Sequence, residues 1–324
     1  MNRRRFLVTG GAGFIGSHIA VTLANAGHQV RVLDDFSTGY ERNLADVTDE
    51  ARGRFTVLRG DLRDAQTVRD AVEGVDVIFH EGAVASVPRS LAEPEVTLDV
   101  NVHGTLNVLE AARVHGVRRV VIASSSAIYG DTPTLPLSES MAPRPLSPYA
   151  VHKLTGEHFC SIYGSLYGLE TVALRYFNVY GPRQDPNSEY AAVIPRFVER
   201  LRAGEPPIVF GDGEQTRDFV YVGDVVRANL LAATVERAAG GVFNVASGQR
   251  TSLNQVLRIA SELLGGEARP EYREARIGDV RDSVADITLA RDVLGFAPQV
   301  EFADGLASLL AGRATAATLE GIAL

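Results

Sequence analysis

Short hydrophobic runs rich in β-branched residues alternate with amphipathic stretches through the first half of the chain. Short apolar runs bounded by turn-forming residues are typical of buried strands. We therefore predict strands at Phe6–Thr9, Val30–Asp34, Thr56–Arg59, Val77–His80, Val120–Ala123 and Thr171–Arg175. The intervening stretches place hydrophobic residues at helical spacing. They predict helices at Ser17–Ala26, Ala65–Val72, Asn101–His115 and Tyr149–Tyr167.

This alternation predicts an α/β fold in which helices cover both faces of a parallel sheet. Right-handed crossovers then give a doubly wound, Rossmann-type sheet. The alternation of strand and helix patterns ends after residue 175, where prolines and glycines become frequent. We predict a first domain over residues 1–175, with a returning segment near 218–246. Residues 176–324 are expected to form a smaller, discontinuous mixed α/β lobe that carries the substrate contacts.

The composition is that of an ordinary globular protein, since 45% of the 324 residues are hydrophobic and 22% are charged. This balance excludes a disordered or collagen-like chain. The formal net charge of −8 argues against nucleic acid and against an anionic membrane surface as partners. An anionic substrate is not excluded, because a few arginines placed together make a local positive site despite the negative net charge of the chain.

The chain has a single cysteine, Cys160, so an intramolecular disulfide and a thiolate metal site are both excluded. The basic start Arg3–Arg5 is followed by an apolar run too short for a signal peptide. No run approaches the ~18 apolar residues of a membrane span. The spacing of the seven histidines matches no ligand set, so no metal is expected. We expect a soluble, cytoplasmic protein.

The first predicted strand leads through a glycine-rich turn, Gly10–Gly16, into a helix. Glycines let a pyrophosphate approach the helix N-terminus, where free N–H groups and the helix dipole favour anions. Alone, such a turn is also common as a purely structural element. Here the second strand ends at Asp34 and Asp35, with Asp34 18 residues beyond Gly16, where an acid binds the adenosine ribose hydroxyls. We therefore predict a dinucleotide site.

An acid at this position repels a 2′-phosphate, so NAD is favoured over NADP. We favour Asp34 over Asp35 for the ribose, because Asp34 ends the apolar strand pattern. Acidic or small residues also follow the third and fourth strands, where contacts to the adenine and close backbone approach are expected. The residues predicted to bind NAD are Gly10, Gly13, Phe14, Ile15, Gly16, Asp34, Asp35, Asp61, Leu62, Gly82 and Ala83.

Tyr149 and Lys153 lie one helical turn apart, so their side chains share a helix face. Ser147 suits the cap of this helix and Pro148 its first turn. A cation beside a phenol favours the phenolate and lowers the tyrosine pKa from about 10. The pair then predicts a general base, although such a pair is also common on a solvated helix face.

A run of three serines, Ser124–Ser126, follows the fifth predicted strand. At the carboxyl end of a parallel sheet a serine hydroxyl can bind a reacting sugar oxygen. Serine runs in loops are also ordinary turn residues. The run ends 23 residues before Tyr149, which leaves room for a loop that returns to the same crevice.

Together these motifs resemble the extended branch of the short-chain dehydrogenase/reductase superfamily, and within it the NAD-dependent nucleotide-sugar epimerase/dehydratase family, in particular the UDP-hexose 4-epimerases. The resemblance covers nearly the whole chain. It is carried by Thr9–Gly16, Ser124–Ser126, Tyr149 with Lys153, Arg175–Pro182, Arg217–Phe219 and Arg276–Asp279.

The resemblance implies a role for each matching residue. Tyr149 would be the base, Lys153 would bind the nicotinamide ribose, and Ser126 would orient the C4 oxygen of the sugar. Further cofactor contacts are implied for Ser124, Asn101 and Tyr176. The UDP-sugar would be bound by Ala85, Ser86, Ser126, Tyr149, Asn178, Arg217, Arg276, Asp279 and Ser283.

Members of the family oxidise the sugar at C4 and differ in the later steps of the reaction. Dehydratases carry an Asp-Glu pair beside the catalytic hydroxyl and decarboxylases usually a Glu, whereas this chain has Ala127 and Ile128. The resemblance therefore implies an isomerase, a UDP-hexose 4-epimerase that works through a 4-keto intermediate. Alternatives are a UDP-glucuronate 4-epimerase, another nucleotide-sugar dehydratase/epimerase, or a catalytically silent NAD-bound scaffold.

Ser283 matches a position where glucose-restricted relatives carry a bulky tyrosine, so a 2-acetamido group has room. UDP-N-acetylglucosamine and UDP-N-acetylgalactosamine are implied beside UDP-glucose and UDP-galactose. A uronate also stays open, because Arg89 or Arg183 would meet its carboxylate. The apolar stripes of the helices at 101–115 and 149–167 imply, by analogy with the family, a homodimer.

Overall fold

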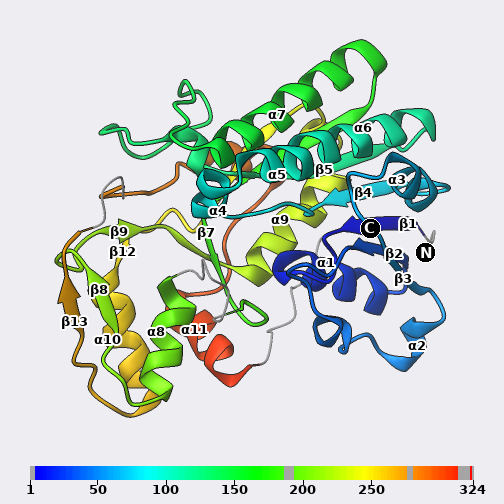
Figure 1. The fold of residues 1–324 in the computed structure, drawn as a ribbon. Helices are drawn as coiled ribbons and strands as arrows, with labels where there is room; N and C mark the ends of the chain where they lie inside the picture. The colour runs from blue at the N-terminus through cyan, green and yellow to red at the C-terminus, as the bar shows by residue number, and fades with distance from the viewer. Residues whose placement is uncertain (1–3, 186–192, 276–279, 313–321, 323–324) are drawn as a thin grey trace.

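A computed structural model describes residues 4–185, 193–275, 280–312 and 322. Its centre is a parallel sheet with the strand order β11-β6-β5-β4-β1-β2-β3 (Figure 1). The strands are β1 (Arg5–Thr9), β2 (Gln29–Asp34), β3 (Phe55–Arg59), β4 (Val77–His80), β5 (Arg119–Ser125), β6 (Glu170–Tyr176) and β11 (Val242–Val245). All six predicted strands are present, and the predicted doubly wound α/β fold is confirmed.

Helices lie on both faces of this sheet (Figure 1). One face is covered by α1 (Phe14–Asn25) and α9 (Val222–Thr234), the other by α3 (Ala65–Val72), α6 (Gly104–Val114) and α7 (Pro148–Tyr167). A hydrophobic core lies on each face of the sheet, and successive strand residues point alternately into one core and the other. In β1, Phe6 and Val8 pack on the α1 side and Leu7 on the α6 side. Burial of such a side chain contributes roughly 1.5–3 kcal/mol, which explains why the strands are hydrophobic on both faces.

Two of the predicted helices differ at their starts. α1 begins at Phe14, directly after the glycine turn, rather than at Ser17. A π-helical turn, η2 (Asp99–His103), precedes α6, so the segment predicted as one helix changes its geometry at Gly104. α7 begins as predicted, because the Ala150 N–H donates to Ser147 Oγ (3.2 Å).

After β6, much of the described chain forms short strand pairs and helices beside the sheet, most of which lie toward the lower left of Figure 1. The pairs are β7 (Asn178–Tyr180) with β10 (Phe219–Tyr221), β9 (Thr216–Arg217) with β12 (Thr251–Ser252), and β8 (Ile208–Phe210) with β13 (Glu271–Arg273). The helices are α8 (Val193–Arg202), α10 (Leu253–Leu264) and α11 (Phe302–Ala311). No helix within the described ranges is both long and apolar enough to cross a membrane.

Glycine is required where the turn after β1 meets the loop after β4. Gly10 has φ of +64°, in the left-handed region, and a Cβ there would stand 2.7 Å from the Cα of Gly82. A Cβ on Gly16 would collide with the carbonyl oxygen of Gly10. These glycines therefore bring two backbone segments into direct contact at the carboxyl edge of the sheet.

A buried hydrogen-bond chain fixes the same edge. Thr105 Oγ1 donates to Asn101 O (2.7 Å), so it accepts from His80 Nε2 (2.9 Å). His80 Nδ1 then accepts from Thr9 Oγ1 (2.7 Å), which makes the imidazole neutral. Burial lowers the pKa of His80 to about 3, with a smaller contribution from Lys153. The ends of β1 and β4 are thus tied to α6 by polar groups that stay uncharged at neutral pH.

Candidate active site

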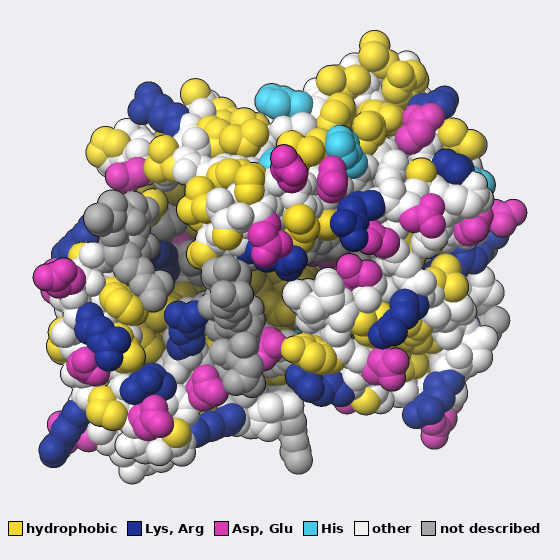
Figure 2. All heavy atoms as spheres, in the orientation of Figure 1, with side chains coloured by type: hydrophobic (Ala, Val, Ile, Leu, Met, Phe, Trp, Pro, Cys, Tyr) yellow, Lys and Arg dark blue, Asp and Glu magenta, His cyan; other side chains and the backbone are white. Residues whose placement is uncertain are grey.

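The carboxyl ends of β1, β4, β5 and β6 open onto one crevice, where the strand order reverses between β1 and β4. Ligands of doubly wound sheets bind at such a switch point. Figure 2 shows the surface hollowed where the sheet meets the smaller lobe, with hydrophobic side chains at its floor. The site is therefore expected between the sheet edge and this lobe.

The glycine turn forms an anion cradle at the start of α1. Gly13 is the N-cap and offers no side chain to the free N–H groups, and the first turn carries no acidic residue. The free N–H groups and the helix dipole favour an anion here. Because a Cβ at Gly10 or Gly16 would obstruct the turn, the residues present fit the pyrophosphate of the predicted dinucleotide.

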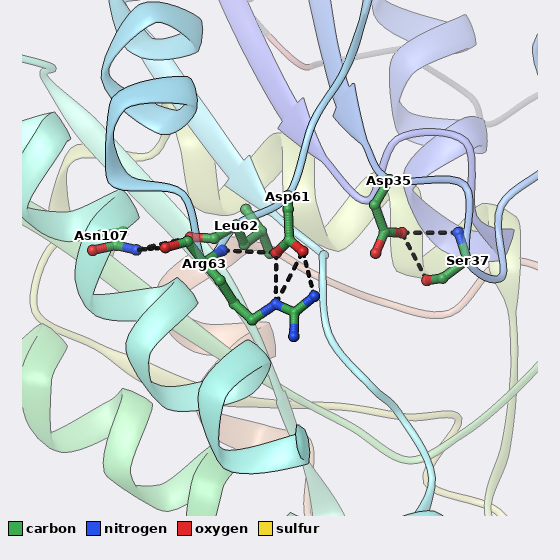
Figure 3. Close-up of polar contacts among 6 residues, drawn as sticks. All are labelled: Asp35, Ser37, Asp61, Leu62, Arg63 and Asn107. Carbon is green, nitrogen blue, oxygen red and sulfur yellow. Dashed lines mark hydrogen bonds and ion pairs between the residues drawn. The ribbon is translucent and has the colours of Figure 1, made fainter. Parts of the chain in front are cut away.

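Asp34 and Asp35, at the end of β2, differ in their surroundings. Asp34 is buried, and its two oxygens accept from the N–H groups of Ala12 and Phe36 (2.8 Å each). Burial raises the pKa of Asp34, and these hydrogen bonds partly offset the effect. Asp35 is exposed and accepts from Ser37 (Figure 3). Asp34 therefore fastens the glycine turn, and the choice of ribose partner stays a prediction.

Asp61 and Leu62 follow β3 and are held from two sides (Figure 3). Arg63 Nε donates to both carboxylate oxygens of Asp61 (3.0 and 2.9 Å), and this hydrogen bonding lowers the pKa of the Asp61 carboxyl. Asn107 of α6 donates to Leu62 O (2.8 Å). The predicted adenine-binding segment is thus fixed before any ligand arrives.

Asn101 acts on the loop after β4. Its Oδ1 accepts from Val84 N (2.7 Å) and its Nδ2 donates to Val84 O (3.1 Å), and the side chain is buried. This amide holds the loop that begins with Gly82 and Ala83. Asn101 therefore supports the predicted cofactor site indirectly, because it holds the loop after β4 in place.

Tyr149 and Lys153 stand at the start of α7 and are half-buried. Lys153 Nζ donates to Ala123 O at the end of β5 (2.8 Å) and lies 5.9 Å from the centroid of the Tyr149 ring. The side chain of Ser125 is close enough to Tyr149 to act on the phenol as a hydrogen-bond donor and lower its pKa. The structure thus brings a phenol, a hydroxyl and a buried cation together at the sheet edge.

The expected lowering of the Tyr149 pKa by Lys153 is not found. Burial raises the pKa of Tyr149 above its usual value, and the hydrogen bond from Ser125 lowers it in part. The physical reason is that burial desolvates the phenolate, while the ammonium lies over the ring. Burial also lowers the pKa of Lys153.

The serine beside Tyr149 is Ser125, which sequence reasoning missed. Ser124 is buried and donates to Glu157 Oε1 (2.5 Å), a carboxylate paired with Arg175 (2.7 Å). Ser126 begins a short 3-10 helix, η3 (Ser126–Tyr129). Neighbouring residues of a strand point to opposite faces of the sheet, so the side chains of Ser124 and Ser125 face different sides. This alternation was the signal in the sequence that separates the two serines. The roles predicted for Ser124 and Ser126 stay predictions.

A cavity of about 370 Å³ lies in the smaller lobe, lined by Asn178 and Arg217 among others. Gln184 and Gln215 also line it, and the Oε1 atom of each is buried without a hydrogen-bond partner in the described part of the chain. Two unsatisfied amide oxygens favour a ligand that presents N–H donors. The predicted substrate residues Asn178 and Arg217 therefore share one pocket.

The other predicted substrate residues are spread around the crevice. Ser283 is half-buried and its N–H donates to Thr216 O (3.2 Å), next to Arg217. Ala85 is exposed, and Ser86 caps α4 (Val87–Ala92), where its Oγ accepts from Arg89 N (3.1 Å). Arg276 and Asp279 lie outside the described residues.

The sequence model described as NAD dependent epimerase/dehydratase family matches residues 6–246. A UDP-glucose 4-epimerase of Mycolicibacterium smegmatis is 43% identical over 305 residues, covering 94% of this chain and 96% of that protein. A solved UDP-N-acetylglucosamine 4-epimerase of Methanobrevibacter ruminantium, in complex with UDP-N-acetylmuramic acid, has a TM-score of 0.91 at 40% identity, covering 96% of this chain and 98% of that one. A UDP-glucose 4-epimerase of Thermus thermophilus, in complex with NAD, has a TM-score of 0.85 at 40% identity, with 95% and 98% covered.

Replacing Ser125 with alanine should raise the pKa of Tyr149, because the phenolate loses a hydrogen-bond donor. Titration of the protein labelled with ¹³C at tyrosine Cζ measures this by NMR, and a Tyr149→Phe variant assigns the signal. Ser126→Ala is the matched control and should leave the midpoint unchanged. A shift in Ser126→Ala with none in Ser125→Ala would contradict the assignment.

Proposed function

The chain belongs to the NAD dependent epimerase/dehydratase family, and we propose that it is an NAD-dependent UDP-sugar 4-epimerase. One observation carries the proposal: Tyr149 stands with Ser125 and Lys153 at the carboxyl end of β5. Ser126 and Ala127, which follow Ser125, bear no carboxylate for loss of water or carbon dioxide. The relatives named above are 4-epimerases, which supports the same reaction.

NAD is the cofactor that fits the cradle at Gly10–Gly16 and the carboxylates that end β2. Bound there, it would supply the acceptor and later the donor of a hydride at the sugar C4, together with a positive charge that favours the phenolate. Asp34 keeps the turn in shape, and Asn101 holds the loop of Gly82 and Ala83 against it. These residues bind and orient, and they take no part in proton transfer.

Proton transfer is assigned to Tyr149. It accepts the proton of the C4 hydroxyl while C4 becomes a ketone, and it returns the proton when the opposite face is reduced. We assign the orientation of the C4 oxygen to Ser125 in place of Ser126, because the Ser125 side chain is the one that acts on Tyr149. Lys153, held by Ala123 O, supplies a fixed cation beside the phenol. Oxidation and reduction cancel, so the protein needs no external oxidant.

The nucleotide part of the substrate is assigned to the cavity of the smaller lobe. Arg217 suits a diphosphate, since a guanidinium binds phosphate oxygens in pairs. The free Oε1 atoms of Gln184 and Gln215 suit N–H donors such as that of a uracil ring. The assignment of Arg276 and Asp279 to the diphosphate and ribose rests on the family resemblance alone.

A uronate substrate is less favoured. Of the two arginines that we predicted to meet its carboxylate, Arg89 pairs with Glu93 (3.3 Å) and Arg183 with Asp46 (2.5 Å). Each of these arginines therefore already has a carboxylate partner in the described structure. Neutral UDP-hexoses need no such partner.

Incubation of the purified protein with UDP-glucose, UDP-N-acetylglucosamine and their C4 epimers tests the function. We expect at least one UDP-sugar and its C4 epimer to interconvert. Chromatography of the nucleotide sugars measures this conversion. Tyr149→Phe should lower turnover by about 10²–10⁴-fold while NAD and UDP-sugar still bind, as expected for loss of a general base. A 6-deoxy-4-keto product would contradict the proposal, and absence of any turnover would favour a silent scaffold.

Replacing Ser283 with tyrosine should narrow the substrate range. Ser283 is half-buried and matches the position where glucose-restricted relatives carry a tyrosine, so with Ser283→Tyr the 2-acetamido substrates should lose about tenfold or more in kcat/KM relative to UDP-glucose. Ser283→Ala, which adds no bulk, is the control and should keep both classes. If Ser283→Tyr reduced kcat/KM equally for the 2-acetamido substrates and for UDP-glucose, residue 283 would not select between them.

A homodimer is a further part of the proposal. Hydrophobic side chains gather at the end of α7, at the upper right of Figure 2, where Ile162 is 45% and Leu166 69% exposed. Exposed apolar clusters of this kind favour an interface. Ile162→Glu with Leu166→Glu should give monomers by light scattering. The matched control Leu263→Glu, on α10 and 44% exposed, should leave the mass unchanged, and an unchanged mass in the α7 variant would argue against this interface.

A cytoplasmic location completes the proposal. Its support is the single cysteine, Cys160, which is buried and has no cysteine to pair with in the chain. Cell fractionation with antibody detection tests it, and recovery from a membrane or extracellular fraction would contradict it.

A further inference from the structure

Glu81 places a carboxylate at the sheet edge where the candidate base stands, and it is not one of the residues assigned above. It follows β4 directly and is half-buried at the carboxyl edge of the sheet. Its backbone N–H donates to Thr9 O (3.2 Å), so the main chain is fixed against the end of β1. A negatively charged group in this position needs a partner, because an unpaired buried charge is strongly destabilising.

The carboxylate is anchored by two buried side chains. Asn229 of α9 donates through Nδ2 to Tyr176 Oη (2.8 Å), and Tyr176 Oη donates to Glu81 Oε1 (2.8 Å). Asn229 Nδ2 also donates to Val225 O (2.9 Å), which fixes the direction of the chain. Both Tyr176 and Asn229 are buried. The phenol proton is therefore committed to Glu81, and the carboxylate stays where this anchor holds it.

Among the described residues, the titratable groups that act on Glu81 come from two elements. Tyr176 of β6 is its hydrogen-bond donor, and α7 contributes Lys153 and Tyr149, which are close enough for their charges to interact with Glu81. The neighbouring His80 turns the other way, toward Thr9 and Thr105. β4 and β5 pair with His80 opposite Ile122, so Glu81 comes next to Ala123, whose carbonyl oxygen accepts from Lys153 Nζ (2.8 Å).

We propose that Glu81 is a positioning residue of the proton-transfer site, whose carboxylate, anchored by Tyr176, keeps Lys153 charged and sets the pH range in which Tyr149 works. The inference rests on the proposed function through the role of Tyr149. Glu81 itself exchanges no proton with the substrate. Its effect passes through charge alone.

The directions of the pKa shifts agree with this geometry. Burial raises the pKa of Glu81, and both the Tyr176 hydrogen bond and the charge of Lys153 oppose that rise. Burial lowers the pKa of Lys153, and Glu81 raises it again. For Tyr149, burial and then Glu81 raise the pKa against the Ser125 hydrogen bond. Glu81 and Lys153 therefore each favour the charged form of the other.

Glu81→Gln removes the charge and keeps an oxygen that accepts from Tyr176. Without the charge the pKa of Lys153 should fall, and so should that of Tyr149. The reaction needs phenolate and ammonium together, so both limbs of the pH profile of kcat/KM should move to lower pH. Glu81→Asp keeps the charge and should keep the limbs in place even if turnover falls.

Glu139→Gln is the matched control, because Glu139 is also half-buried and also accepts a hydrogen bond, from Asn244 N (2.7 Å). It should leave both limbs unmoved. If Glu81→Gln lowers the height of the profile and moves neither limb, Glu81 is only structural and the inference is overturned.

A titration without substrate separates this inference from the proposed function. In protein labelled at tyrosine Cζ, the Tyr149 midpoint should move to lower pH in Glu81→Gln. Tyr176→Phe should move it the same way by a smaller amount, because the anchor favours the charged form of Glu81, and should add nothing in the Glu81→Gln background. If the Tyr149 midpoint does not move in Glu81→Gln, the inference is overturned whether or not any UDP-sugar is epimerised. If Tyr176→Phe moves the midpoint equally with and without Glu81→Gln, Tyr176 does not act through Glu81.

Discussion

The ammonium group of the half-buried Lys153 is the constraint on which the rest of the site depends. Removing a charge from water is unfavourable unless hydrogen bonds and opposite charge replace the solvent. Ala123 O supplies the hydrogen bond (2.8 Å) and Glu81 the opposite charge. Both come from strand ends, so α7 must pack against the sheet in one register. Ser147 and Pro148, which start this helix, then decide where Tyr149 stands.

The second constraint joins the two parts of the chain. Asp218 lies buried directly after Arg217, and its carboxylate accepts from the N–H groups of Ser247 (2.8 Å), Gly248 (3.0 Å) and Ala285 (3.0 Å). On the other side, His18 of α1 donates to Pro182 O (2.9 Å). The pocket proposed for the nucleotide is thus held against the sheet on which α7, with Tyr149, packs. A sugar bound through its nucleotide would meet a base that is already in place.

The inner strands were predictable because they are buried on both faces and read as apolar runs. The edge strand β3 has no fully buried residue and was recognisable by its β-branched Thr56 and Val57. The glycine turn was predictable because only glycine fits its backbone. The start of α1 was missed because glycines conceal a helix N-terminus. Ser125 was missed because the direction of a side chain at a strand end depends on the pleat. The hydrogen bonds that run from Asn229 to Tyr176 and from Tyr176 to Glu81 join α9, β6 and the end of β4, which are far apart in the sequence, so no local pattern predicts them. The division at residue 175 stays a prediction.

Transfer of hydrogen at C4 is the central claim, and isotope labelling tests it most directly. The protein is incubated with UDP-glucose deuterated at C4, and with UDP-N-acetylglucosamine labelled in the same way, and the products are examined by NMR. If the sugar is oxidised and reduced at C4 while Tyr149 moves only the hydroxyl proton, the deuterium remains at C4 of the epimer. Loss of the label to water, or entry of solvent hydrogen at a neighbouring carbon, would contradict the account.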